Sequence, residues 1–358
     1  MIKNVEKQDY KAIKEFIRLN DGKGIQYSPL FQDFVEETYS NCKKGYKIVV
    51  GKDEKIKAYL PFIILKGLFS NKKRLVCTPF VDSSGLLGRL SSKEVKLFCE
   101  ESFKAGIKRI EVRLNDSSKE NLKKIKILEN SGFSKLSAKQ QYIIRIADEK
   151  DFWDRFHKHT RNDIRKAEKS GLIIKEINSK EEINDFYSLY FKNMKYFGSP
   201  SHSKAYFTNL FKILRENVCG LNCYYHGKLA GAVILMHNNG YGYLAFNVSD
   251  PSLRDYRPND LLYWSIIKSC IKEKINLLDV GQVDTTSEDS REKSLYSFKS
   301  KWLGEVYNKY LLVKNVDNSR DKPSTSKNKV KIMRAVFSKL PSFMLAYLGP
   351  YICSRTGR

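Results

Sequence analysis

The sequence predicts an α/β protein made of two similar halves, each with a mixed, largely antiparallel sheet flanked by helices. Two strand–turn–strand patterns carry this prediction, one over residues 46–64 and one over residues 221–236. Each pattern is followed by a helical segment that leads into an apolar strand, over residues 92–114 in the first half and 261–280 in the second. The shared order of elements indicates an internal duplication.

Helical segments also precede both hairpins. Hydrophobic residues recur with helical spacing over residues 30–39, 180–197 and 203–216. An apolar strand over residues 140–146, followed by a basic helix, joins the two halves. We therefore predict one domain over residues 1–145 and a second over residues 146–315.

Residues 316–358 differ in composition from both halves. Residues 317–331 are polar and charged without hydrophobic periodicity, which is typical of a linker. A basic amphipathic segment and an apolar segment follow, separated by Pro341. The apolar segment is too short to span a bilayer. Either it packs back onto the domains, or residues 330–353 form a peripheral contact with a membrane.

Composition limits the classes of partner. Lys and Arg number 65 against 40 Asp and Glu, so the formal net charge of the 358-residue chain is +25. Such a charge attracts tRNA, nucleotide phosphates or anionic lipid, unless most of the lysines simply solvate the surface. The first ten residues lack the apolar core of a secretory signal. We expect a cytoplasmic protein, at most peripheral on the inner face of the membrane.

Familiar cofactor, metal and nucleophile motifs do not occur in the sequence. The seven cysteines are scattered and odd in number, which favours reduced thiols, and no His and Cys set has the spacing of a zinc site. There is no P-loop, strand-anchored G-x-G-x-x-G, G-x-S-x-G elbow or H-E-x-x-H helix. We therefore expect no ATP hydrolysis, no dinucleotide redox chemistry, no metal site and no bound cofactor.

Two polar segments offer candidate substrate contacts. Asp82 lies in a turn-rich segment after an apolar strand, where it would accept a proton from an amine or bind a sugar hydroxyl. Asp and Ser are also ordinary turn residues, which is the simpler interpretation. Arg161 and Arg165 lie one turn apart in a basic helix. Guanidinium groups bind phosphate through paired hydrogen bonds, so this face fits a phosphate-rich ligand or is a solvated helix surface.

Two further segments lie in the second half. His202 ends a Gly/Pro-containing turn between two helices and is a candidate for substrate contact, although capping of the next helix explains much of that segment. A strand ends at Asp279, a polar loop begins at Gln282, and Lys299 follows beside an aromatic residue. Because sites in α/β folds form at loops after strands, Lys299 is a candidate for holding a phosphate or the oxyanion of an acyl-transfer intermediate.

Together these segments resemble the FemAB family of aminoacyl-tRNA-dependent transferases and the related BioF2-like acyltransferases. The first half is similar more weakly, mainly through Pro79–Asp82. The matching segments of the second half are Thr160–Gly171, Tyr187–His202, Tyr256–Trp264, Leu278–Gly281 and Phe298–Gly304. The resemblance implies two tandem GNAT-like domains, which are domains of the acyl-CoA N-acyltransferase fold.

The resemblance also implies an activity and roles for individual residues. Members of the family transfer an amino acid from charged tRNA to an amine of a lipid-linked cell-wall peptide, and remoter relatives move acyl groups in surface-polysaccharide pathways. By position, Lys299 would stabilise the developing oxyanion, Phe298 would shape the pocket, and Asp82 would lie near the acceptor amine. Arg161 would bind a phosphate of the donor or acceptor. The other candidates for substrate binding are Arg165, His202, Asn259, Asp279 and Gln282.

Departures from the family bear on the acceptor and the donor. The helical arm that some members insert in the second domain is missing, and Glu36 and Glu37 lie where a first-domain lysine is expected. The acceptor therefore stays open between a lipid-linked amine and a sugar-nucleotide amine. No Q/R-x-x-G-x-G/A loop for the coenzyme A pyrophosphate is evident, which favours aminoacyl-tRNA over acyl-CoA as donor. The alternatives are an acyl-CoA-dependent N-acyltransferase acting on an amino sugar and a non-catalytic RNA- or membrane-binding protein.

Overall fold

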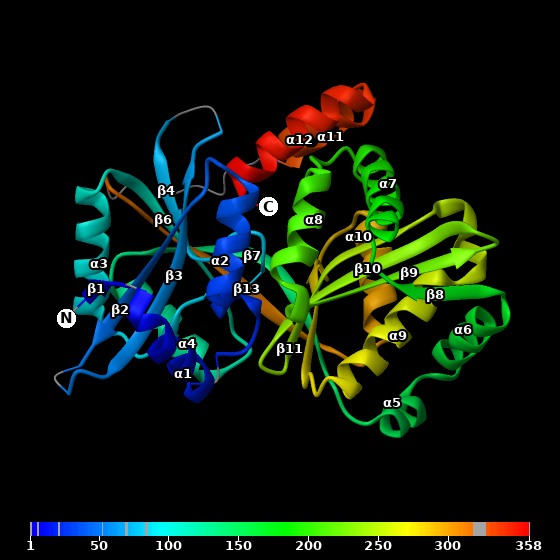
Figure 1. Cartoon of the computed structure of the whole chain (residues 1–358), viewed down its shortest axis with the longest axis horizontal. Coiled ribbons are helices and arrows are strands. Elements are labelled where there is room, and N and C mark those ends of the chain that lie inside the picture. Colours follow the sequence, from blue (N-terminus) through cyan, green and yellow to red (C-terminus); the bar gives the residue numbers. More distant parts are fainter. Residues whose placement is uncertain are drawn as a thin grey trace. The chain divides into compact units, whose positions relative to one another are not determined.

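The computed structural model describes residues 2–5, 7–20, 22–51, 53–68, 71–82, 85–317 and 327–357, which form two compact α/β units (Figure 1). The first unit comprises Met1–Gln140, Tyr307–Val330 and Tyr351–Arg358. The second comprises Gln141–Val306 and Lys331–Pro350. The predicted fold class, two α/β halves with largely antiparallel sheets, is confirmed.

The first unit holds six strands of one continuous order, β1-β2-β3-β4-β6-β13, in which β4 and β6 are parallel and the other neighbours are antiparallel. A short strand, β5, pairs with β3. The elements are β1 (Ile2–Asn4), α1 (Tyr10–Leu19), α2 (Pro29–Thr38), β2 (Lys43–Val50), β3 (Ile56–Lys66), β4 (Lys73–Val76), β5 (Leu87–Gly88), α3 (Ser92–Lys104), β6 (Ile107–Asn115), α4 (Lys119–Asn130) and β13 (Glu305–Asn315).

Alternation along β3 distributes the core of this unit over both faces of its sheet. Tyr59 packs with α1, whereas Leu60 and Phe62 pack with α3 and α4. Successive side chains of a strand point to opposite faces, so a strand buried on both faces is apolar at almost every position. The sequence of β3 has that character, which is why the hairpin of β2 and β3 was predictable.

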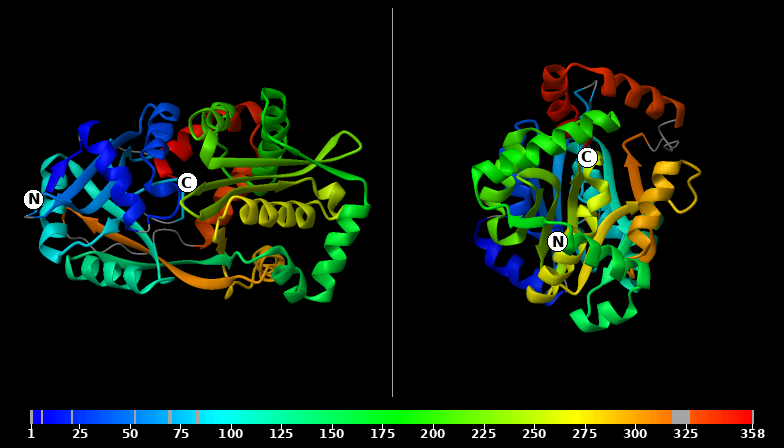
Figure 2. Two further views of the ribbon diagram at one scale, coloured as in Figure 1. Left: turned by 60° about the horizontal axis from the view of Figure 1, so that its bottom comes forward. Right: turned by 90° about the vertical axis from the view of Figure 1, so that its right-hand side faces the viewer.

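The second unit has the strand order β7-β12-β11-β10-β9-β8. Helices α7 and α8 cover one face of this sheet, and α6 and α9 cover the other (Figures 1 and 2). Its elements are β7 (Ser134–Arg145), α5 (Glu149–Arg155), α6 (Lys158–Lys169), β8 (Leu172–Glu176), α7 (Lys180–Phe197), α8 (Lys204–Ile213), β9 (Val218–Tyr225), β10 (Lys228–Asn238), β11 (Tyr241–Ser249), α9 (Pro258–Lys272), β12 (Leu277–Val283) and α10 (Ser290–Ser300).

The two units repeat the same order of elements, in agreement with the predicted duplication. The order β2-β3-β4-α3-β6-α4 in the first unit corresponds to β9-β10-β11-α9-β12-α10 in the second. The strand that follows each repeat passes into the other unit, since β7 belongs to the second unit from Gln141 and β13 to the first from Tyr307. Residues 309–315, expected from the sequence in the second domain, pair with β6 of the first unit.

Two helices, α11 (Lys327–Lys339) and α12 (Ser342–Thr356), make up the C-terminal segment. They are separated at Pro341, as the sequence predicts. Most of the predicted linker, residues 318–326, lies outside the described residues. Within the described ranges, no helix combines the length and the apolar character that crossing a bilayer requires.

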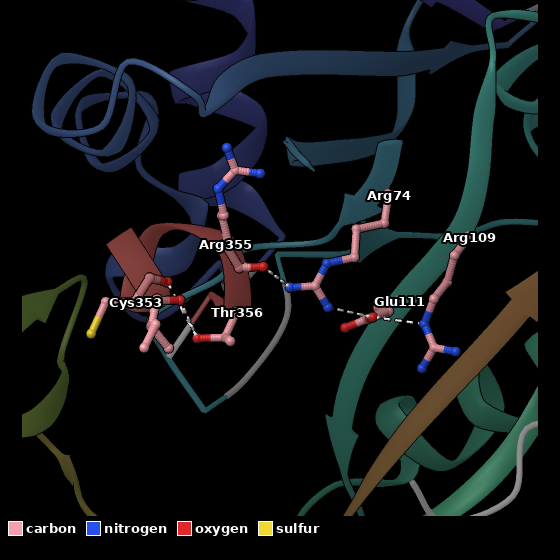
Figure 3. A network of polar contacts seen from close by, with 7 residues as sticks. Arg74, Arg109, Glu111, Cys353, Arg355 and Thr356 are labelled. Carbon is pink, nitrogen blue, oxygen red and sulfur yellow. Dashed lines mark hydrogen bonds and ion pairs between the residues drawn. The ribbon is translucent and has the colours of Figure 1, made fainter. Parts of the chain in front are cut away.

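A buried carboxylate joins β4 and β6 to the end of α12 in the first unit (Figure 3). Glu111 accepts from Arg74 Nη1 at 2.9 Å and from Arg109 Nε at 2.8 Å, and Arg74 also donates to the Arg355 carbonyl. Burial by itself raises the pKa of Glu111, but the charges of Arg74, Arg113 and Arg109 outweigh burial and hold that pKa below its ordinary value.

Replacing Glu111 with Gln should destabilise the protein by about 2–4 kcal/mol at pH 7, because two half-buried guanidinium groups lose a buried counter-charge. The stabilisation by the ionised carboxylate is present above the ordinary Glu pKa of 4.5 and disappears as the pH falls through the lower pKa of the folded state. Urea unfolding at pH 7 and at pH 3.5 measures both effects. An equal loss in the exposed control E100Q, or a difference that does not shrink in acid, would contradict the prediction.

Candidate functional site

The parallel strands β11 and β12 separate soon after they begin. They pair over three residues, from Tyr241 with Leu277 to Tyr243 with Asp279. Strand β11 continues to Ser249 and β12 to Val283, so the strands part where both are still extended. A split between parallel strands exposes backbone groups inside a sheet, and this is a common place for a site in α/β folds.

Asp279 and Gly281 lie where the two strands separate. The buried Asp279 carboxylate accepts from the Gly281 N–H at 2.8 Å, so a side chain takes a backbone donor of the strand. Gly281 has φ +81°, a left-handed conformation that favours glycine and bends β12. Tyr241 Oη at 3.1 Å and the Gln141 amide also donate to this carboxylate. The Leu-Asp-Val-Gly segment therefore places a buried, hydrogen-bonded carboxylate and a left-handed glycine where β12 stops pairing with β11.

A β-bulge lies in β11 beside the split. Ile234 of β10 pairs with Phe246 and Leu235 pairs with Leu244, so Ala245 is the extra residue. Phe246 then packs against rings of α7 and α8, while Asn247 reaches Tyr263 on α9. Bulges redirect strand groups and are frequent beside active sites. The bulge here lies in the stretch of β11 that no longer pairs with β12.

Helices α9 and α10 line one side of the split. The Phe298 ring meets the buried Tyr263 ring edge-on with centroids 4.9 Å apart. Asn259 donates from Nδ2 to Ser249 Oγ at 3.3 Å at the end of β11, and its buried Oδ1 has no hydrogen-bond partner among the described residues. The candidates Phe298 and Asn259 therefore lie on the same side of the sheet.

Lys299 is buried. Its ammonium group contacts the backbone of β12 beyond the last residue that pairs with β11. Nζ donates to the Gln282 carbonyl at 2.9 Å, so the predicted residues Lys299 and Gln282 are in contact near the end of β12, whereas Asp279 lies three residues earlier in the same strand with other partners. The loop expected over residues 282–292 is shorter, because β12 extends to Val283 and α10 begins at Ser290. The hydrogen bond to Gln282 thus holds the Lys299 ammonium group near the end of β12.

The two basic candidates of α6, Arg161 and Arg165, contact residues of α5 and of its C-terminal end. Arg161 Nη1 donates to the carbonyls of Trp153, Asp154 and Phe156, and the Arg165 guanidinium lies 5.2 Å from the centre of the Trp153 ring. A cation that satisfies the carbonyls at a helix C-terminus is stabilised by the helix dipole. The sequence-derived phosphate-binding role of these arginines stays a prediction.

Asp82 lies in the first unit, in the segment that follows β4. Its carboxylate forms a buried ion pair with Lys309 of β13, with Oδ1 and Nζ 2.6 Å apart. Thr78 and Phe80 in the same segment have φ of 57° and 65°, a strained conformation for residues other than glycine. The proposed proximity of Asp82 to an acceptor amine stays a prediction.

His202 lies on the opposite face of the second unit's sheet from Lys299. Its ring stacks on Tyr206 with centroids 4.0 Å apart and meets Phe246 edge-on, and its backbone N–H donates to Tyr190 Oη at 2.9 Å. Burial among these rings lowers the pKa of His202 to about 3, so the imidazole is neutral at physiological pH. Its role in substrate contact stays a prediction.

Sequence reasoning missed the contributions of Ala245, Asn247 and Tyr263 to the split. Tyr263 lies inside the matching segment Tyr256–Trp264, so its position was available, but its contact with Asn247 depends on the fold. The bulge at Ala245 has no signature in a single sequence, because the extra residue is defined only by the register with β10.

A comparison with known protein families matches residues 154–294 to the acetyltransferase (GNAT) domain. The matched segment is less than half of the chain. It contains β11, the bulge, the split and α9, and it ends within α10. No curated protein matches the sequence. The family match therefore covers the second unit's candidate site but stops before Phe298 and Lys299.

The similarity to solved structures covers more of the chain than the family match does. FemX has a TM-score of 0.68 at 12% identity and covers 86% of this chain and 96% of its own. A tandem GNAT protein from the clavulanic acid biosynthesis pathway has a TM-score of 0.57 at 10% identity, with 90% and 99% covered. An Agrobacterium fabrum domain described as the C-terminal part of a lysylphosphatidylglycerol synthetase has a TM-score of 0.53 at 10% identity, with 92% and 96% covered. The chain thus shares the fold of FemX and of a tandem GNAT protein.

The neutral His202, inside the segment that matches the GNAT domain, predicts a pH dependence of stability. An unfolded histidine binds a proton near pH 6.5, whereas the folded one does not until about pH 3. Stability therefore falls with decreasing pH in this interval, by up to about 1.4 kcal/mol per pH unit from this group. The variant H202F should lose this component in urea titrations between pH 7.5 and 5, and H159F, at an exposed histidine, should keep it. Equal slopes for wild type and H202F would contradict the prediction.

Proposed function

We propose that the protein forms an amide by transferring an acyl or aminoacyl group to an amino group of a cell-envelope precursor, with aminoacyl-tRNA as the donor. The observation that carries the proposal is Lys299, a buried ammonium group held at the end of β12 beside the split of the GNAT-fold unit. The fold shared with FemX supports it. The name of a second similar structure, lysylphosphatidylglycerol synthetase, describes an aminoacyl group joined to a lipid.

Aminolysis of an ester is the chemistry that this site supports. The acceptor amine attacks the ester carbonyl of the donor, a carbon–nitrogen bond forms, and the carbonyl oxygen gains negative charge. Lys299 would stabilise that oxygen, and this stabilisation lowers the barrier because it is strongest in the transition state. The carbon–oxygen bond to the ribose then breaks, and the proton lost by the amine ends on the ribose oxygen. No covalent enzyme intermediate is required.

The start of α9 supports a donor other than acyl-CoA. Helix N-termini bind pyrophosphate through free backbone N–H groups. Here Pro258 has no N–H, and the N–H groups of Asp260 and Leu261 already donate to the Arg257 carbonyl. The buried Asp260 carboxyl, paired with Lys301, adds an acidic group to the first turn. This helix start therefore offers few donors to an incoming pyrophosphate.

The second candidate is an acyl-CoA-dependent N-acyltransferase that modifies an amino sugar. The match of residues 154–294 to the acetyltransferase (GNAT) domain favours it. The two candidates share the fold and the amide-forming chemistry, and they differ in the donor. A donor-binding experiment therefore separates them.

Titration of the full chain with aminoacylated tRNA, uncharged tRNA and acetyl-CoA, followed by calorimetry at about 0.15 M salt, tests the donor. We expect tighter binding of aminoacylated than of uncharged tRNA, because only the charged form places an ester in the split. A net charge of +25 binds any tRNA in a salt-dependent way, so the difference between the two tRNAs is the informative quantity. Saturable acetyl-CoA binding with equal affinity for both tRNAs would replace the proposal with the second candidate.

Replacing Lys299 with Ala should lower kcat about 100-fold or more, in line with the loss of one oxyanion-stabilising group. Donor affinity should change little, because the interaction develops mainly in the transition state. The exposed Lys293 of the same helix provides the matched control, and K293A should keep full turnover. Thermal melting separates catalysis from folding, since K299A also removes the hydrogen bond to Gln282. Full turnover by a folded K299A would remove Lys299 from the mechanism.

A further inference from the structure

Large apolar side chains are gathered on the outer surface of α11 and α12. Phe343 and Tyr347 are 75% and 80% exposed, and Met333 and Val336 are 54% and 53% exposed. Met344, at 37%, completes this set, which we call the C-terminal patch. Single exposed apolar residues are ordinary, but a group on neighbouring helices marks an interaction surface.

The patch lies on a helix that is firmly seated within the second unit. Phe343 and Tyr347 lie one turn apart, and Leu345 and Gly349 occupy the opposite face of α12, because two residues rotate a helix by about 200°. Leu345 is fully buried, and a Cβ on Gly349 would lie 2.7 Å from Ser201 Oγ. The inner face of α12 is therefore already used, and the aromatic side chains of its outer face point away from the core.

The end of α7 holds α11 and the start of α12 in place. Lys195 Nζ donates to Ser342 Oγ at 3.0 Å, and Gly198 in the left-handed conformation allows the Arg334 backbone to approach closely. Tyr196, 68% exposed, and Phe197, 38% exposed, follow Lys195 directly. The C-terminal patch therefore lies on two helices that contact the end of α7. Tyr196 and Phe197, at that end of α7, add exposed aromatic side chains.

The charges carried by α11 and α12 themselves have one sign. One acidic side chain from outside them, Asp289, lies near Arg334, and its pKa is lowered chiefly by backbone hydrogen bonds and also by that cation. The sequence contains no Asp or Glu after Asp321, and Arg334 and Lys339 are exposed on α11 beside Met333 and Val336. Exposed aromatic and aliphatic groups flanked by basic residues match a bilayer interface, where rings lie at the headgroup level and cations meet anionic phosphates. A protein partner would more commonly be met by charges of both signs.

We propose that the C-terminal patch docks the protein on an anionic lipid bilayer, with Phe343 and Tyr347 inserted at the interface and Arg334 and Lys339 on the headgroups. The helices lie on the membrane and do not cross it, consistent with their length. The proposal goes beyond the proposed transferase activity. Binding to lipid needs neither donor nor acceptor, so its failure would leave that activity untouched.

Co-sedimentation of the full chain with vesicles tests the proposal. We expect binding to phosphatidylglycerol/phosphatidylcholine vesicles, weakened by salt, and little binding to pure phosphatidylcholine. The double variant F343S/Y347S should bind at least about tenfold more weakly, because two exposed rings no longer enter the interface. The control L19S/I173S changes two apolar residues of similar exposure, 65% and 58%, and should bind as the wild type does.

A second pair of variants separates contact of the patch's basic residues with the lipid from the general attraction of a positively charged protein to anionic vesicles. R334E/K339E and K96E/K104E lower the net charge by the same amount, and all four side chains are exposed. The proposal requires the first pair to weaken vesicle binding much more than the second. Equal effects of the two pairs, or no binding of wild type to anionic vesicles, would overturn it. A self-association that F343S/Y347S abolishes, without vesicle binding, would assign the patch to a protein interface instead.

Discussion

The buried carboxylate of Asp279 is the constraint on which the candidate site depends. A carboxylate inside a sheet is costly unless donors surround it, and here the Gly281 N–H, Tyr241 Oη and the Gln141 amide do so. These donors come from β12, β11 and β7, so one side chain ties three neighbouring strands together. The pairing of β12 with β11 stops at Asp279, and Lys299 is held beyond this point by the Gln282 carbonyl.

Several residues of the resemblance motifs act by holding the site in shape. The buried Trp302 stacks on Tyr263, with centroids 5.4 Å apart, and Gly304 has no room for a Cβ because Tyr142 and the Ile143 carbonyl lie against it. Arg161 closes the end of α5. Motif residues in a fold family therefore serve packing as well as chemistry, and contact geometry is needed to tell these roles apart.

The exchange of strands between the two units makes each of them depend on distant parts of the chain. Lys309 pairs with Asn115 across β13 and β6, and its ammonium group neutralises the buried Asp82 carboxylate. The first unit is therefore complete only after residues 307–315 are available, which raises the sequence separation of its contacts and slows folding. A buried carboxylate without its lysine would also be strongly destabilising.

The sequence by itself determined the two hairpins, their following helices and strands, and the duplication, because alternation and helical spacing are local signals. It also singled out Lys299, Asp279 and Gln282; Lys299 and Gln282 are in contact, and the roles of all three stay predictions. It did not indicate the helices α4 and α10, whose sequences are rich in polar and charged residues, or the exchange of β7 and β13. Only the tertiary structure decided the bulge at Ala245 and the early separation of β11 from β12, because register and strand pairing depend on contacts between segments distant in sequence.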